Sequence, residues 1–93
     1  MINVGGYKVN PSEVEESMRS IPGIKEVRVY AKSNSVLGNI VCCETVRSDE
    51  LLDESTIRAH LHDKLQEFKI PRIFTFVEML STTRTGKIKR NQL

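Results

Sequence analysis

Apolar residues recur at two different spacings along this chain, and the alternation between them constrains the fold more than any other feature. Between residues 14 and 21 they recur at the spacing of one helix face, and this helix is expected to end near Pro22-Gly23. Residues 27–32 instead alternate between apolar and polar side chains, as in a strand with one buried face. A polar loop over 33–38 and a more continuously apolar strand over 40–46 are expected next.

The second half of the chain repeats this alternation. One face of the next predicted helix carries four apolar residues: Ile57, Leu61, Leu65 and Phe68. Pro71 is expected to stop that helix, and a last strand is expected from Ile73 to Glu78. The pattern predicts an α+β fold, with a small, mainly antiparallel three-stranded sheet, packed helices and an N-terminal β-hairpin.

The predicted hairpin pairs Ile2–Val4 with Tyr7–Val9 across Gly5-Gly6. A glycine pair suits the positive φ angles of a tight turn. Asn10 is then expected to cap the first helix, with Glu13 three residues later as in a capping box. The hairpin and the cap together fix where the first helix begins.

The net charge of +2 is unevenly distributed. Four cations lie in the last ten residues, and no acid lies between Ser81 and Leu93: Arg84, Lys87, Lys89 and Arg90. The rest of the chain therefore carries two net negative charges. Nucleic-acid binding is not favoured, because no aromatic residue interleaves with these cations and no recognised nucleic-acid motif accompanies them.

The cysteines and histidines do not indicate a metal site. Cys42 and Cys43 are adjacent in a predicted strand, so they should point to opposite faces and act as buried apolar residues in a reduced compartment. His60 and His62 lie near the edges of a helix stripe with no closed set of ligands around them. The sequence contains no charged leader and no apolar stretch long enough for a membrane span, and a cytoplasmic protein is expected.

Gly86 directly precedes Lys87 near the C-terminus. A glycine at this position lets the backbone bring one ammonium group close to a phosphate or a carboxylate. A Walker loop is excluded, because it needs glycine where Ser81 stands and Ser or Thr where Ile88 stands. Lys87 is therefore interpreted as a point charge on a mobile segment, without a phosphate cradle of its own.

Two motifs, one at each end of the chain, resemble those of the C-terminal subdomain of the adenylate-forming superfamily. This superfamily contains acyl-CoA synthetases, peptide-synthetase adenylation domains and luciferases. The family pattern G-[YFW]-[KR]-[VI]-x-P-x-E-[IV]-E is matched by Gly6, Tyr7, Lys8, Val9, Pro11, Glu13, Val14 and Glu15. The pattern P-x-T-x-[ST]-G-K-[IV]-x-R-x-x-L is matched by Thr83, Thr85, Gly86, Lys87, Ile88, Arg90 and Leu93. Two positions depart from the family, which commonly has proline at Ser81 and glutamate at Asn39.

The resemblance implies that residues 1–93 are the mobile C-terminal subdomain of an ATP-dependent acid–CoA ligase. Such enzymes use ATP and Mg²⁺ to convert a carboxylic acid into an acyl adenylate, and most then transfer the acyl group to a thiol such as that of CoA. Lys87, next to Gly86, is implied to stabilise the adenylation step. After rotation of the subdomain, the hairpin is implied to border the thiol path through Gly5, Gly6, Tyr7 and Lys8.

Ninety-three residues form one small domain with little room for a pocket that encloses ATP together with a substrate. A larger N-terminal adenylation domain is therefore expected as the partner, and the isolated chain is expected to be inactive. Two alternatives stay open. The acceptor could be the pantetheine of a carrier protein instead of CoA, or the chain could be a non-catalytic interaction module of the same fold.

Overall fold

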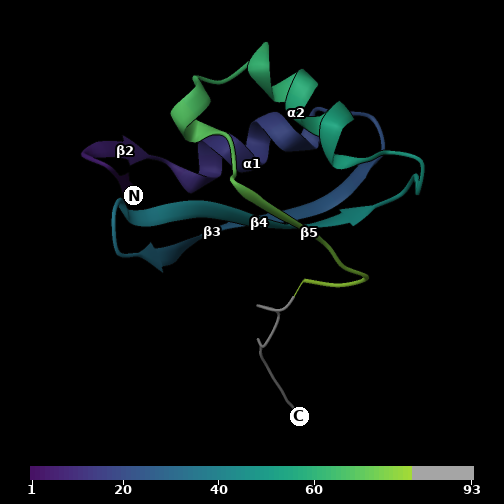
Figure 1. Cartoon of the computed structure of the whole chain (residues 1–93). Coiled ribbons are helices and arrows are strands. Elements are labelled where there is room, and N and C mark those ends of the chain that lie inside the picture. Colours follow the sequence, from purple (N-terminus) through teal and green to yellow (C-terminus); the bar gives the residue numbers. More distant parts are fainter. Residues whose placement is uncertain (81–93) are drawn as a thin grey trace.

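The computed structural model describes residues 1–80 of the chain, drawn in colour in Figure 1. Eight elements follow one another: β1 (Ile2–Val4), β2 (Tyr7–Val9), α1 (Pro11–Arg19), β3 (Ile24–Asn34), β4 (Gly38–Arg47), α2 (Glu54–His62), the 3-10 helix η1 (Glu67–Lys69) and β5 (Ile73–Phe76). The predicted hairpin is confirmed residue by residue as β1 and β2. Gly86 and Lys87 lie outside the described residues.

Three strands form the main sheet in the order β3-β4-β5. β3 and β4 are antiparallel from Ile24↔Arg47 to Asn34↔Gly38, whereas β4 and β5 are parallel from Cys42↔Ile73 to Thr45↔Phe76. The predicted α+β class is confirmed. The second pairing is parallel because α2 and η1 form a crossover that brings the chain back before β5 begins.

Both helices pack on the same face of the sheet (Figure 1). Their apolar stripes meet the inward side chains of β3 and β4 in one core. Its fully buried members include Val14, Met18, Val41, Cys43, Ile57 and Leu61. Val27 and Val29 are buried as predicted, whereas Ala31, predicted for the same face, is exposed. None of the helices within residues 1–80 is long and apolar enough to cross a membrane.

Glu15 fastens α1 to the edge of the sheet. Its Oε2 accepts a hydrogen bond of 2.9 Å from the backbone N–H of Val29, and its Oε1 lies 3.7 Å from Nη2 of Arg19. Within residues 1–80, β3 is an edge strand, so the backbone groups that it turns away from β4 have no partner strand there. A helix carboxylate therefore satisfies a strand amide.

The N-terminal cap of α1 is confirmed, but its second half differs from the prediction. Asn10 Oδ1 accepts from the N–H of Ser12 at 3.0 Å. Glu13 does not complete a capping box; its carboxylate instead accepts from Lys69 Nζ at 3.1 Å. The acid therefore joins the start of α1 to η1, which lies 56 positions further along the chain.

The predicted second helix is too long, because α2 ends at His62. Gln66 is extended, with φ −65° and ψ 149°, so the chain leaves the helix axis well before Pro71. Leu65 nevertheless stays buried, and Phe68 lies in η1, where its ring stacks on Tyr7. These tertiary contacts override the helical spacing of the apolar residues.

The predicted loop between β3 and β4 is likewise shorter in the structure. Both strands extend into it, and only residues 35–37 remain between them. Asn34 Oδ1 accepts from the N–H groups of Val36 and Leu37, at 3.0 Å and 2.9 Å, and Gly38 takes a φ of 85°. An asparagine-organised turn and one glycine therefore close the hairpin tightly.

Cys42 and Cys43 are free and fully buried, as predicted for small apolar residues. Burial raises the pKa of the Cys43 thiol to about 12, and burial also raises the pKa of Cys42. Both thiols are therefore protonated and unreactive near neutral pH.

Candidate functional site

The glycine turn, Gly5 and Gly6, connects β1 to β2 and has the positive φ angles that glycine adopts without strain, 55° and 92°. A Cβ at Gly6 would meet no atom within 4 Å, whereas a Cβ at Gly5 would lie 3.4 Å from Cδ2 of Leu37. Gly5 thus faces the protein, and Gly6 leaves open space beside its backbone. A ligand can approach Gly6 closely.

Hydrogen bonds hold this turn in place. The Gly5 N–H donates to the carbonyl oxygen of Leu37 at 2.8 Å, and the Gly6 N–H donates to Oδ1 of Asn3 at 3.2 Å. The first bond links the glycine turn to the turn between β3 and β4. The second closes the hairpin on itself.

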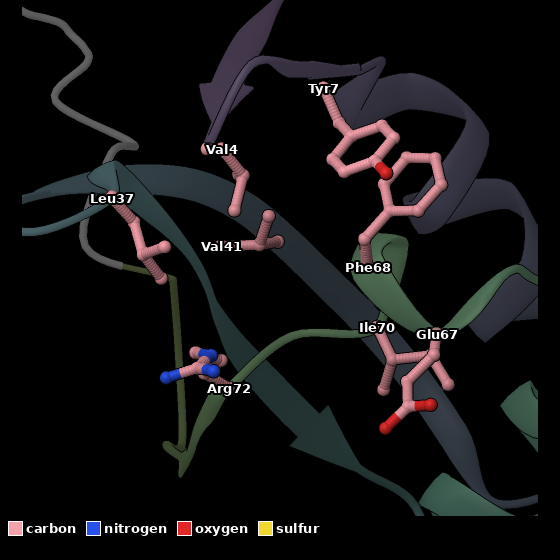
Figure 2. Close-up of a pocket in the computed structure, with 9 residues that line it drawn as sticks. Val4, Tyr7, Leu37, Val41, Glu67, Phe68, Ile70 and Arg72 are labelled. Carbon is pink, nitrogen blue, oxygen red and sulfur yellow. The ribbon is translucent and has the colours of Figure 1, made fainter.

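Tyr7 follows the glycine turn and packs against η1. Its ring lies 4.5 Å from that of Phe68, with an angle of 25° between the two planes. Figure 2 shows the two rings stacked next to each other. Tyr7 is nevertheless 59% exposed, so the pair presents a flat aromatic surface to the solvent.

A cavity of about 260 Å³ lies between the hairpin and η1. Figure 2 shows apolar side chains around it from the hairpin, β4, η1, the turn at Leu37 and the segment after η1 at Ile70. Its lining comprises Val4, Gly5, Tyr7, Leu37, Val41, Glu67, Phe68, Ile70 and Arg72. Ligand pockets usually measure roughly 300–1,000 Å³, so this cavity can border part of a ligand but cannot enclose a nucleotide.

The predicted site residues divide into two groups. Gly5 and Tyr7 line this cavity, and Gly6 lies between them in the chain. Lys8 follows on β2, exposed and opposite Asn3 in the register. Gly86 and Lys87 lie outside the described residues, and the structure does not test them. The structure therefore describes only the predicted site residues that lie in the hairpin.

Seven lining residues are not among the predicted site residues: Val4, Leu37, Val41, Glu67, Phe68, Ile70 and Arg72. Phe68 was assigned to a helix stripe, and only the fold reveals that it leaves the helix. Arg72 is exposed, its backbone N–H donates to the Val41 carbonyl at 2.8 Å, and its carbonyl accepts from Arg58 Nη2 at 3.0 Å. In the sequence, the feature that marks this region is Pro71, because it stands just before β5.

The fold and the site define an α+β domain that carries an open glycine turn beside a small apolar cavity. The sequence pattern of the family described as AMP-binding enzyme C-terminal domain matches residues 13–87. This stretch is most of the chain. The chain belongs to the AMP-binding enzyme C-terminal domain family.

Relatives of the chain include ligases with two kinds of acceptor. It is 36% identical to the 2-succinylbenzoate–CoA ligase of Listeria monocytogenes, of which it covers 20%. It is 34% identical to a 3,4-dihydroxybenzoate–[aryl-carrier protein] ligase of Bacillus anthracis, of which it covers 22%. Both alignments span the whole of this chain, which therefore corresponds to about a fifth of these relatives.

A solved structure of a Mycobacterium tuberculosis fatty acyl CoA synthetase matches the fold with a TM-score of 0.84 at 31% identity. The match covers 95% of this chain and 18% of the synthetase chain. The chain therefore has the fold of a small part of that synthetase.

Proposed function

We propose that this chain is the mobile C-terminal domain of an ATP-dependent, AMP-forming acid–CoA ligase. In this proposal it supplies Lys87 to adenylation and the glycine turn to thioester formation. The observation that carries the proposal is the open space at Gly6 beside the exposed Tyr7 ring, in a chain that belongs to this family. ATP, the acid and Mg²⁺ are assigned to the larger N-terminal domain.

The proposal assigns Mg²⁺ and the nucleotide to the partner domain. Residues 1–80 bring together no group of three or more His, Cys, Asp or Glu side chains that could hold a metal ion. The cavity between the hairpin and η1 is also too small for a nucleotide. In this proposal, the larger domain therefore holds the metal and most of the nucleotide.

In the first step, a carboxylate oxygen attacks the α-phosphorus of ATP, and pyrophosphate leaves. Negative charge gathers on the oxygens around that phosphorus. An ammonium between the carboxylate and the phosphate lowers this barrier electrostatically and orients both groups. Lys87 is the residue proposed for this position, with Gly86 allowing the backbone to approach.

In the second step, the thiolate sulfur attacks the acyl carbon of the adenylate, a thioester forms and AMP leaves. Rotation of the domain is proposed to replace Lys87 with the hairpin beside the adenylate. Gly6 then lets the thiol arm pass close to the backbone, between Tyr7 and Lys8. The apolar wall near Val4 and Leu37 suits the alkyl part of such an arm.

Pantetheine on a carrier protein is the second candidate acceptor. It is favoured by a carrier-protein ligase that is nearly as similar to this chain as the CoA ligase is. Free CoA and a pantetheine-loaded carrier protein can be offered separately to the same acyl adenylate. The acceptor that forms thioester decides between the two.

Gly6→Leu tests the hairpin assignment in the full natural polypeptide that carries this chain. Gly6→Ala is the matched control, because both variants place a Cβ at a positive φ but only leucine fills the open space. We expect leucine to slow thioester formation from supplied acyl adenylate about 10- to 100-fold while pyrophosphate release persists. Equal losses in both half-reactions, or equal effects of alanine and leucine, would reject a role for Gly6 in the thiol path.

A further inference from the structure

The glycine turn rests on the turn between β3 and β4, residues 35–37, which we term the support turn. The Leu37 carbonyl accepts the N–H of Gly5 at 2.8 Å, and the Leu37 side chain covers the inner face of Gly5. Both contacts join segments that are more than thirty residues apart in the sequence. The position of the glycine turn therefore depends on the support turn.

Asn34 fixes the support turn itself. Its Oδ1 accepts from two successive backbone amides, those of Val36 and Leu37, at 3.0 Å and 2.9 Å. An asparagine that accepts from amides two and three positions ahead determines the local course of the backbone. Asn34 thus orients the peptide group whose carbonyl receives Gly5.

Asn39 makes a second connection, just after the support turn. Its Nδ2 donates to the backbone oxygen of Asn3 at 3.2 Å. Oδ1 of the same Asn3 accepts from the N–H of Gly6. Asn39 therefore holds the residue that orders Gly6, and a chain of contacts leads from β4 through β1 to the glycine turn.

The side-chain amide of Asn39 supplies the donor of this bond. An ionised carboxylate at this position would accept hydrogen bonds but could not donate one to a carbonyl. Only a donor at position 39 can make the observed bond to Asn3. In this chain, the hairpin is therefore attached to the sheet by a side chain as well as by the backbone.

We infer that Asn34 and Asn39 are positioning residues for thiol transfer, which hold the glycine turn at a fixed place relative to the sheet. The inference rests on the proposed function of the hairpin. Neither residue touches the thiol; each acts through the backbone of Gly5 or Gly6. Loss of either connection lets the turn move, and small displacements around a reacting group strongly reduce its rate.

Asn39→Asp and Asn34→Ala test the inference in the full natural polypeptide. The aspartate keeps the shape of Asn39 but removes the donor, whereas the alanine removes the acceptor that organises the support turn. Ser35→Ala is the matched control, since Ser35 is an exposed residue of the same turn whose side chain takes part in none of these bonds. Hydrogen exchange of the segment that contains Gly5 and Gly6 is measured together with both half-reactions.

We expect both variants to exchange faster in this segment and to form thioester from supplied acyl adenylate about 2- to 10-fold more slowly, the range that corresponds to one neutral hydrogen bond. Pyrophosphate release and the Ser35→Ala control should stay at the parental level. Faster exchange with an unchanged thioester rate would overturn the inference. Equal slowing of both half-reactions would overturn it as well, because the effect would then be general.

The Gly6→Leu variant separates this inference from the proposed function. If leucine slows thioester formation and the asparagine variants do not, the hairpin role stands and the positioning role is wrong. If leucine has no effect on thioester formation, the proposed hairpin role fails, and the inference fails with it.

Discussion

Replacing Glu15 with alanine should destabilise the domain more than the same replacement of any other acid in α1. The change removes the acceptor of the Val29 N–H, in a residue that is only 6% exposed. Water cannot readily replace the lost carboxylate at such a position. A buried amide left without a partner costs about 1–3 kcal/mol.

The loss of the contact with Arg19 adds little to this figure. The two charged atoms are 3.7 Å apart, and Arg19 is 54% exposed, so solvent screens the pair. Exposed pairs of this spacing contribute about 0.3–0.5 kcal/mol. We therefore expect Glu15→Ala to lower the free energy of unfolding by about 1–3.5 kcal/mol, and the melting temperature by about 5–28 °C for a domain of this size.

Two further variants identify the cause. Glu15→Gln keeps an oxygen that can accept from Val29 but loses the charge, so it should cost about 1 kcal/mol. Glu16→Ala removes an exposed glutamate from the same helix and should change stability by less than about 0.5 kcal/mol. Urea unfolding of the purified chain measures all three. The reasoning is refuted if Glu15→Ala is no less stable than Glu16→Ala, or if glutamine is no better than alanine.

In the full natural polypeptide, Lys87→Ala should greatly slow pyrophosphate release and leave thioester formation from supplied adenylate largely intact. Lys87→Arg should restore little of the lost rate, because the planar guanidinium does not reproduce a compact ammonium. Adenylation at the parental rate would show that Lys87 is not the adenylation lysine. The Cys43 thiol predicts a pH effect: its pKa is raised from 9.0 to about 12, so above pH 9 the unfolded state binds fewer protons than the folded state. The free energy of unfolding should be unaffected by this thiol below pH 9 and should fall by up to about 1.4 kcal/mol per pH unit as the pH rises towards 12. Cys43→Ala should flatten this slope in urea titrations, and an unchanged slope would contradict the assignment.

The local parts of the fold could be predicted from the sequence because short-range physics determines them. Gly5-Gly6 specifies a tight turn, Asn10 caps the helix that follows, and Val14 and Met18 are spaced for one helix face. Each of these features depends on residues within a few positions of one another. The sequence pattern therefore located the hairpin and the start of α1 correctly, whereas α1 ends at Arg19, before the predicted end near Pro22-Gly23.

The connections between distant segments could not be predicted in the same way. The spacing of Leu65 and Phe68 continues a helix stripe, but both residues reach their contacts from a turn and from η1. Glu13 matches a capping box in sequence, whereas its charge meets Lys69 in space. In both cases a tertiary partner competes with the local preference and wins, and nothing in the local sequence reveals that partner.

The N-terminal motif contains residues that the fold requires and residues that remain available for function. Val9 and Val14 are fully buried, and Glu15 holds β3, so the fold itself requires these three residues. Tyr7 and Lys8 are exposed, and within residues 1–80 the Tyr7 ring stacks on Phe68. A non-catalytic module could therefore retain most of the motif for stability alone. Substitutions at the exposed positions, tested on the two half-reactions, distinguish a ligase domain from such a module.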